Sequence, residues 1–491
     1  MTTEKRPPVL RRTTRGCLIG TSAIAVLILA HAATLAADSK AAGKKPEDAP
    51  LTVRIALRPA AEPSPALRYR LLPPLLDRQP GNAAVFYNKA ALMYQQNPEL
   101  AKQGDKVSQW NDLPLDMLPL DEIEKTLAPW STVFAEIGFA VKREQCDWQL
   151  PIHEQMPFSI LLPEFQTLRA VARAVRLRAR WQVAKHQYDD AVETMATMYA
   201  MARHCGEGQT LIQGLVGISF VGMIAQVQED MAGQPGAPNL YWALTWLPRP
   251  FIELRHANGV EMDTIYLWKP ELRRLDQARS ADAWRELFDD LAEGLADFES
   301  ARDKKERRLV LLGKAIQGYP RAKRELIAAG RLSEQVEVMP VAQVLLLHTV
   351  RTYNELRDNQ FKWTALPFWQ AHDGMQRASE RLGAESRRRE IIPLAGTLLP
   401  AVQSVSHAQA RGERTIAMLR TIEALRLYAA AHDGRLPQQL DDISEVPVPH
   451  DPLSGGPFIY DCSDNTAVLE APLVEGMTPQ LGKRYEISVA E

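Results

Sequence analysis

The sequence predicts a mainly α protein, with an irregular helical-hairpin array followed by a small α+β C-terminal module. Two observations lead to this fold class. Apolar residues recur at helical spacing through the middle of the chain, whereas strict alternation of apolar and polar residues is confined to its end, where Tyr485, Ile487 and Val489 alternate with polar residues. A chain of 491 residues with 46% hydrophobic composition is long enough for two or three domains, each with its own core.

The N-terminal segment has the layout of a secretory signal. Three arginines precede an apolar run, 17–36, which ends in small residues before a polar stretch. The run of about 20 residues is also long enough to span a bilayer as an uncleaved helix. We therefore expect residues 1–37 to be a signal peptide or an N-terminal membrane anchor, and 38–59 to be a flexible tether. In either case the protein is exported across the inner membrane and is periplasmic, secreted or anchored.

The charge balance gives no reason to expect nucleic acid as a partner. Residues 1–37 hold five of the 58 basic and one of the 60 acidic residues, so the remaining chain carries a net charge of −6. The charged runs 302–308 and 387–389 are interpreted as solvated helix faces.

Three cysteines follow the N-terminal segment: Cys146, Cys205 and Cys462. Their wide spacing excludes a CxxC metal or redox pair. A disulfide between Cys146 and Cys205 is conceivable in an oxidising compartment, but three buried thiols are the favoured state.

We expect the helical array to occupy residues 60–390. Helices are predicted at 81–96 with Asn82 as the cap, and over about 121–143. Two more flank the turn Lys185-His186-Gln187. Further helices are predicted at 209–231, 250–260, 281–299, 306–316 and 341–377, the last kinked by Pro367.

The predicted helix at 209–231 carries the small residues Gly214, Gly217, Ser219, Gly222 and Ala225, largely on one face. Such a face suits close packing against a neighbouring helix. In a membrane it would indicate dimerisation, but glutamines interrupt the apolar run, so a soluble packing seam is favoured.

In the C-terminal part, residues 391–491, a long helix to Ala431 is expected to stop at Gly434, and Pro437 prevents its resumption. Short strands are predicted at 458–461, 467–470 and 485–489. We expect one face of the helix, made of Ile416, Leu419, Ile422 and Leu425, to lie on the sheet. A fragment of about residues 405–491 is expected to fold alone.

Two parts of the chain resemble known modules. Lys185 to Ala191, with Tyr188-Asp189-Asp190-Ala191, resembles the turn of a single tetratricopeptide (TPR) hairpin. The C-terminal helix, its Gly-x-x-Pro stop and the following Asp-Pro loop resemble the core of type II pseudopilins. The matching residues are Tyr428, Gly434, Pro437, Asp451, Pro452, Gly455, Phe458 and Tyr460.

The whole arrangement is similar to a group of uncharacterised exported bacterial helical proteins. The pseudopilin resemblance implies a long helix with a small antiparallel sheet, acting here as an assembly or docking module. It also raises the possibility of calcium at Asp451, Asp461 and Asp464, for which loop solubility and turn formation are the favoured alternative.

No reaction motif is visible in the sequence, so catalytic, cofactor-binding and metal-binding residues are predicted as none. Glu253 and His256 have the spacing of a di-metal motif, but no second copy accompanies them, and a local Glu–His hydrogen bond is favoured. His432-Asp433 and His450-Asp451 each place an imidazole beside a carboxylate. Next to a helix stop and a strand turn, such pairs are most often caps.

We therefore expect an exported, envelope-associated binding or scaffold protein, with helical grooves for peptide or protein partners and a membrane contact through the N-terminal segment if that is uncleaved. The alternative is an envelope hydrolase whose site is assembled from residues distant in sequence. A deep pocket with three or more convergent His, Asp, Glu, Ser or Cys side chains would favour the enzyme. An open groove lined by Tyr, Trp and Leu would favour binding.

Overall fold

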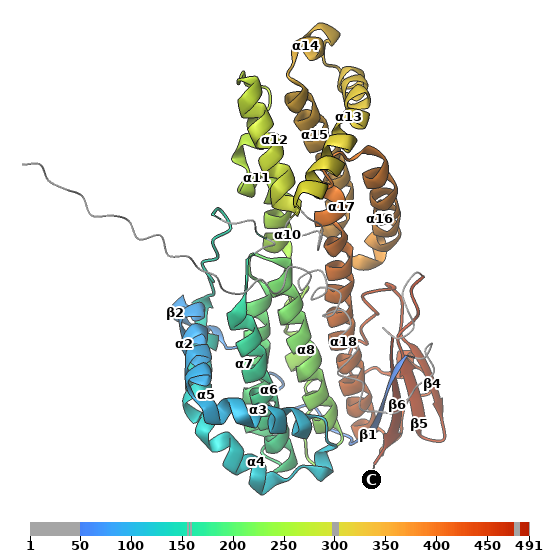
Figure 1. The fold of residues 1–491 in the computed structure, drawn as a ribbon. Helices are drawn as coiled ribbons and strands as arrows, with labels where there is room; N and C mark the ends of the chain where they lie inside the picture. Colours follow the sequence, from blue (N-terminus) through green and yellow to red (C-terminus); the bar gives the residue numbers. More distant parts are fainter. Residues whose placement is uncertain (1–49, 155–156, 158–159, 297–303, 476–481, 491) are drawn as a thin grey trace, which may run out of the picture.

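The computed structural model describes residues 50–154, 157, 160–296, 304–475 and 482–490. Over these residues the chain is mainly helical with a small C-terminal sheet, which confirms the predicted fold class. Figure 1 shows an elongated molecule in which long helices run along the middle, short helices cover one side, and the sheet lies beside the lower half of the last helix. The predicted signal or anchor, 1–37, lies outside the described residues.

Four helices form the N-terminal layer: α2 (Ala83–Gln96), α3 (Pro98–Asn111), α4 (Leu120–Leu127) and α5 (Ser131–Val141). Asn82 caps α2 as predicted, because its side chain accepts a hydrogen bond from the backbone N–H of Ala84 at 3.0 Å. The single helix expected over 121–143 is instead two helices, separated by a short 3-10 turn that contains Pro129. Next to α2, β2 (Gln79–Asn82) pairs in parallel with β3 (Arg143–Gln145).

The predicted helical hairpin is formed by α6 (Pro163–Ala184) and α7 (Tyr188–Gly206). His186 occupies the left-handed position of the turn, with φ of 57°, where glycine is more usual. After a capping box between Thr210 and Gln213, α8 (Leu211–Ala232) runs back along α7. Among the described residues, α8 is the one helix long and apolar enough to cross a membrane. However, 72% of its most apolar stretch is buried inside the protein.

A second group of helices forms the upper bundle of Figure 1. Its members are α10 (Arg255–Met262), α11 (Thr264–Trp268), α12 (Ala281–Ala296), α13 (Lys304–Ala328), α14 (Ser333–Val338), α15 (Val341–Phe361), α16 (Phe368–Arg389) and α17 (Leu394–Leu398), preceded by the short α9 (Tyr241–Thr245).

Two expectations for this bundle are wrong. Pro367 separates α15 from α16 instead of kinking one helix, because a residue before proline avoids the helical region and Leu366 is extended. Arg389 is not on a solvated face: its guanidinium bridges Glu325 and Glu355, at 3.0 and 2.9 Å.

The C-terminal helix α18 (Pro400–Ala431) ends as predicted. Gly434 has a φ of 76°, and its N–H bonds to the carbonyl oxygen of Ala429 at 2.8 Å. The three predicted strands are present as β4 (Ile459–Ser463), β5 (Thr466–Glu470) and β6 (Lys483–Val489), which form an antiparallel meander.

The sheet has a fourth strand that the sequence did not predict. Residues Leu51–Leu57, expected within the tether 38–59, form β1, which pairs in parallel with β6 in the order β1-β6-β5-β4. The tether prediction is wrong for this part because Ile55 and Leu57 are buried and their apolar spacing of two matches a strand. Residues 38–49 lie outside the described part of the chain.

The helix α18 is not amphipathic over its lower half, since every residue from 416 to 427 is buried. It contacts α8, α9 and α16. The expected contact of only one apolar face with the sheet is therefore wrong, because the helical body surrounds the helix as well. The sheet is also tied to the body: Lys483 Nζ and Tyr485 Oη each donate to Glu229 of α8 at 2.6 Å.

A boundary at residue 391 therefore does not separate two independent bodies. A fragment of residues 405–491 lacks both β1 and α8, so the expectation that it folds alone is not supported by the packing of the whole chain.

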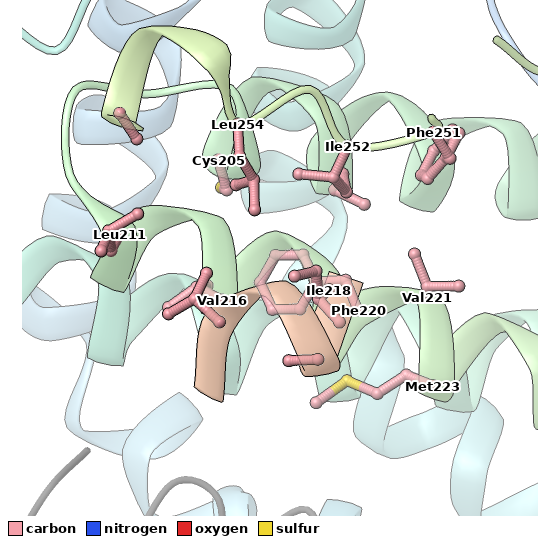
Figure 2. Packing of buried hydrophobic residues seen from close by; sticks show 14 of the residues in the cluster. Cys205, Leu211, Val216, Ile218, Phe220, Val221, Met223, Phe251, Ile252 and Leu254 are labelled. Atoms are coloured by element: carbon pink, nitrogen blue, oxygen red, sulfur yellow. The ribbon is translucent and has the colours of Figure 1, made fainter. Parts of the chain in front are cut away.

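The helices α7 and α8 approach each other closely at their glycines. A Cβ added to Gly217 would lie 2.4 Å from the carbonyl oxygen of Ala202 and 2.5 Å from the Cα of Gly206. A Cβ on Gly214 would meet Leu254 at 2.5 Å. Figure 2 shows the adjoining core, in which Ile252 and Leu254 lie over α8 on the same side as Cys205. The predicted packing seam is thus confirmed for these two glycines but not for Gly222, which is exposed.

We predict that Gly217→Ala destabilises the protein by about 3 kcal/mol, because the new methyl group meets backbone atoms that cannot move away without separating the helices. Gly222→Ala is the matched control on the same helix, since nothing lies within 4 Å of its added Cβ. It should raise stability by roughly 0.5–1 kcal/mol through helix propensity. Urea unfolding of both variants measures the difference, and equal stabilities would contradict the close-approach argument.

Candidate functional site

The candidate site is built on residues 58–78, the connecting segment between β1 and β2. Its prolines disfavour an α-helix, so apart from the short 3-10 helix at Leu75–Asp77 it runs along the surface as an irregular segment. It is fixed at the start of α7, where Arg68 and Tyr69 donate to the two oxygens of Asp189 at 2.7 and 2.8 Å. Leu71 is buried below it. The segment is therefore a stable wall.

Two adjacent hollows open along this wall and share Leu72, Pro73 and Arg78 in their linings. We call them together the composite groove. The first, the polar cavity, has a volume of about 230 Å³, and the second, the apolar cavity, about 270 Å³. Each alone is smaller than a usual small-molecule pocket of roughly 300–1,000 Å³. Their adjacency instead suits an extended ligand that enters both.

The apolar cavity is lined mainly by aliphatic and aromatic side chains from the connecting segment and from the end of α9. Its lining comprises Leu67, Tyr69, Arg70, Leu71, Leu72, Pro73, Pro74, Leu75, Arg78, Ala243, Trp246 and Leu247. Trp246 is 70% exposed and Leu75 is 75% exposed. Large apolar side chains gathered at one exposed place are typical of a binding surface.

The polar cavity is lined by charged side chains from β3 and the last turn of α7. Arg203 and Glu207 neutralise each other through hydrogen bonds of 2.8 to 3.0 Å. Arg143 stacks over the ring of Phe86 at 4.5 Å and donates to the carbonyl oxygen of Pro80 at 2.9 Å.

Three guanidinium groups around the composite groove, those of Arg70, Arg78 and Arg143, have no carboxylate partner within the described part of the chain. Arginine presents a planar fork of donors that matches a carboxylate. The groove therefore combines apolar surface with positive charge, a combination that complements an apolar and acidic ligand.

Cys146 and His204 also line the polar cavity, as do Glu144 and Glu207. Burial raises the pKa of the Cys146 thiol and lowers the pKa of the His204 imidazole to about 4. The His204 ring is already occupied, with Nδ1 bonded to Tyr87 Oη at 3.0 Å and a further hydrogen bond to the backbone of Arg143. A neutral thiol beside a neutral, hydrogen-bonded imidazole is not the ion pair that activates a cysteine nucleophile.

The sequence motifs weighed as sites lie elsewhere. Glu253 accepts a hydrogen bond from the backbone N–H of Arg255 at 2.9 Å, and His256 is exposed. The favoured Glu253–His256 hydrogen bond is therefore wrong, because the local turn gives the carboxylate a backbone partner. At the end of α18 the His432 imidazole bonds to the carboxylate of Glu445 at 3.0 Å and stacks on Tyr428, while its backbone N–H bonds to the carbonyl oxygen of Ala429. The expected side-chain cap is therefore not formed by this imidazole.

The calcium possibility at Asp451, Asp461 and Asp464 is contradicted. Asp451 is fully buried, and Arg414 binds both of its oxygens at 2.8 and 2.7 Å. Backbone N–H groups of Leu453 and Ser454 take its remaining acceptor sites. A carboxylate already satisfied in this way has no lone pair to give a cation. Within the described ranges, no three acidic, histidine or cysteine side chains converge as a metal site.

The three thiols are free, so the conceivable disulfide between Cys146 and Cys205 is not formed. Only Cys205 is fully buried, whereas Cys146 and Cys462 are partly buried. The favoured state of three buried thiols is thus correct for Cys205 alone.

Sequence reasoning missed the composite groove. The Leu-Leu-Pro-Pro-Leu-Leu run at residues 71 to 76 was the available signal, since adjacent prolines between leucines indicate an extended apolar surface. Comparisons of the chain with protein-family models, curated proteins and solved structures give no match. The composite groove is therefore the feature from which we infer a function.

We predict that His204 makes the protein less stable as the pH falls. Its pKa is about 4 when folded and about 6.5 when unfolded, so between these values the unfolded chain binds the extra proton. Stability should therefore fall from pH 6.5 towards pH 4. Urea unfolding of the wild type and of His204→Gln across this range measures the change, and the variant should lose part of the slope. His256→Gln, at an exposed site, should leave the slope unchanged, and identical slopes for all three proteins would contradict the assignment.

Proposed function

We propose that this protein is an exported, envelope-associated binding or scaffold protein whose composite groove binds an extended peptide segment with apolar side chains next to a carboxylate. The single observation that carries the proposal is the shared wall. Leu72, Pro73 and Arg78 line both the apolar cavity and the polar cavity, so exposed apolar surface and arginine side chains adjoin. One ligand in an extended conformation would contact both.

The wall of the groove is held in place before a ligand binds, which favours one ligand conformation over many. The connecting segment is held at Asp189 and again at its beginning, where the N–H groups of Arg58 and Ala60 bond to the carbonyl oxygens of Ala232 and Arg426 at 3.0 and 3.1 Å. A wall that is ordered before the ligand arrives lowers the entropy lost on binding. Leucine and tryptophan side chains supply the apolar contact area, and tryptophan and arginine are the residues that most often dominate binding energy.

The test is selection of peptides from a random displayed library on the immobilised full chain, followed by affinity measurement with a fluorescent copy of a selected peptide. Selected sequences should combine Leu, Phe or Trp with a nearby Asp, Glu or free C-terminus. Trp246→Ala should weaken binding about tenfold or more through lost apolar contact. Arg78→Glu should weaken it by a similar factor and reduce its dependence on salt.

Ile316→Ala and Arg255→Glu are the matched controls, because both residues are well exposed but lie on α13 and α10, away from the groove. Ile316→Ala matches Trp246→Ala in removing an exposed apolar side chain. Arg255→Glu matches Arg78→Glu in its change of net charge. Binding that all four variants leave unchanged, or a library without any enriched sequence, would exclude the groove as a peptide site.

A hydrolase is the second candidate function, because two separate stretches of the chain, with Glu144 and Cys146 on one and His204 and Glu207 on the other, line the same cavity. The protonation states argue against it, since a thiol hydrolase needs a thiolate.

We expect iodoacetamide to modify Cys146 of the native protein at pH 7.5 at least about tenfold more slowly than free cysteine, because its thiol stays protonated. Mass spectrometry resolves the modification by site, with the partly buried Cys462 as the internal reference. Rapid modification of Cys146 that is lost in His204→Ala would instead favour the hydrolase.

Export, the membrane contact through residues 1–37, and the TPR-like and pseudopilin-like resemblances belong to the same proposal. They rest on the order of charge, apolar run and small residues, and on the quoted motifs. An exported protein with a peptide-binding groove would meet its partners, envelope proteins or their segments, outside the cytoplasm.

A further inference from the structure

Two histidines meet where α16, α18 and the described segment after β5, up to Glu475, come together. His372 on α16 and His407 on α18 have ring centroids 5.7 Å apart, and Phe368 packs against both rings. The site is remote in sequence from the composite groove and plays no part in the function proposed for it.

The hydrogen bond of His372 fixes which of its nitrogens carries the proton. Nε2 lies 2.7 Å from the carbonyl oxygen of Glu475, and because a carbonyl can only accept, Nε2 must carry the hydrogen. In the neutral ring, Nδ1 then presents a lone pair. His372 is only 5% exposed, and this Nδ1 is buried without a hydrogen-bond partner in the described structure.

His407 contributes a second buried ring nitrogen, which presents a lone pair when Nδ1 of the neutral ring carries the proton. Its Nε2 is also buried and, over the part of the chain described, has no hydrogen-bond partner. Burial lowers the pKa of His407 to about 4, with the neighbouring His372 and Arg411 adding to the effect, so the ring is neutral at pH 7. A buried polar atom without a partner is costly, and two of them on neighbouring rings, tilted by 38°, point to a ligand.

We infer that His372 Nδ1 and His407 Nε2 form a two-histidine site for a late first-row divalent metal ion such as Zn²⁺ or Cu²⁺. Neutral imidazole is a preferred ligand of these ions. The His372–Glu475 bond has the arrangement usual around metal-bound histidines, in which the second ring nitrogen donates to a backbone carbonyl. Water completes the coordination.

The composition of the site limits its strength. Only two protein ligands are available, and the positive charge of Arg411 lies close to His407. Hard cations such as Ca²⁺ and Mg²⁺, which take oxygen ligands, are disfavoured. A bound ion would link α16 to α18 and, through His372, hold the loop at Glu475 against the bundle.

The test is calorimetric titration of the full chain with ZnCl₂ at pH 7.5. One ion per chain should bind with a Kd on the order of 10 μM, as expected for two imidazoles without a carboxylate. His372→Ala and His407→Ala should each weaken binding at least tenfold, and the double variant should remove it. Zn²⁺ should also raise the Tm of the wild type but not that of the double variant, because only the native site binds the ion.

His256→Ala is the matched control, since it removes an exposed histidine on α10. His407→Gln tests the same site with a smaller change in packing, and circular dichroism checks that each variant is folded. Equal Zn²⁺ affinity in folded wild type and double variant would overturn the inference and assign the binding to exposed histidines. The inference would also be overturned if the wild type bound no Zn²⁺ at 1 mM ZnCl₂, because its Kd would then exceed about 1 mM.

Discussion

The fold depends on the close approach of α7 and α8, where Gly206 and Gly217 lie backbone to backbone. Because neither residue has a side chain, α8 reaches the carbonyl of Ala202 directly. This places α8 at the centre of the molecule, in contact with α6, α7, α10, α18 and β1. A helix with enough apolar length to cross a membrane is thereby used as the core of the body, and its remaining faces bind the last helix and the sheet.

Burial of α18 between the body and the sheet creates a second constraint, because the helix carries charges that cannot reach water. Arg426 pairs with Glu423 and also donates to the carbonyl oxygens of Arg58, Ala237 and Pro238. Arg414 pairs with Asp451 in the same way. Such pairs gain little net energy, since desolvation offsets their attraction, but removal of one partner leaves a buried charge. They connect α18 to three distant segments and fix its position among them.

The composite groove follows from this arrangement. The chain leaves β1, is bonded to α8 and α18, and must then return to β2 along the outside of α7. The prolines disfavour an α-helix along this path, and leucines remain on the surface beside the arginines of the polar cavity. The position of β1 in the sheet thus determines the wall on which the proposed binding function depends. His372 and His407 lie elsewhere, where α16 packs against α18.

The sequence by itself determined the helical class, the cap at Asn82, the stop at Gly434 and the three C-terminal strands, because these follow from local periodicity and from residues acting on their neighbours. Only the tertiary structure decided the rest. The parallel pairing of β1 with β6 joins segments more than 400 residues apart. The groove, the pairs on α18 and the neighbouring histidines likewise join distant residues. No local pattern specifies such partners, because each is chosen by which buried surfaces and charges satisfy one another in the folded chain.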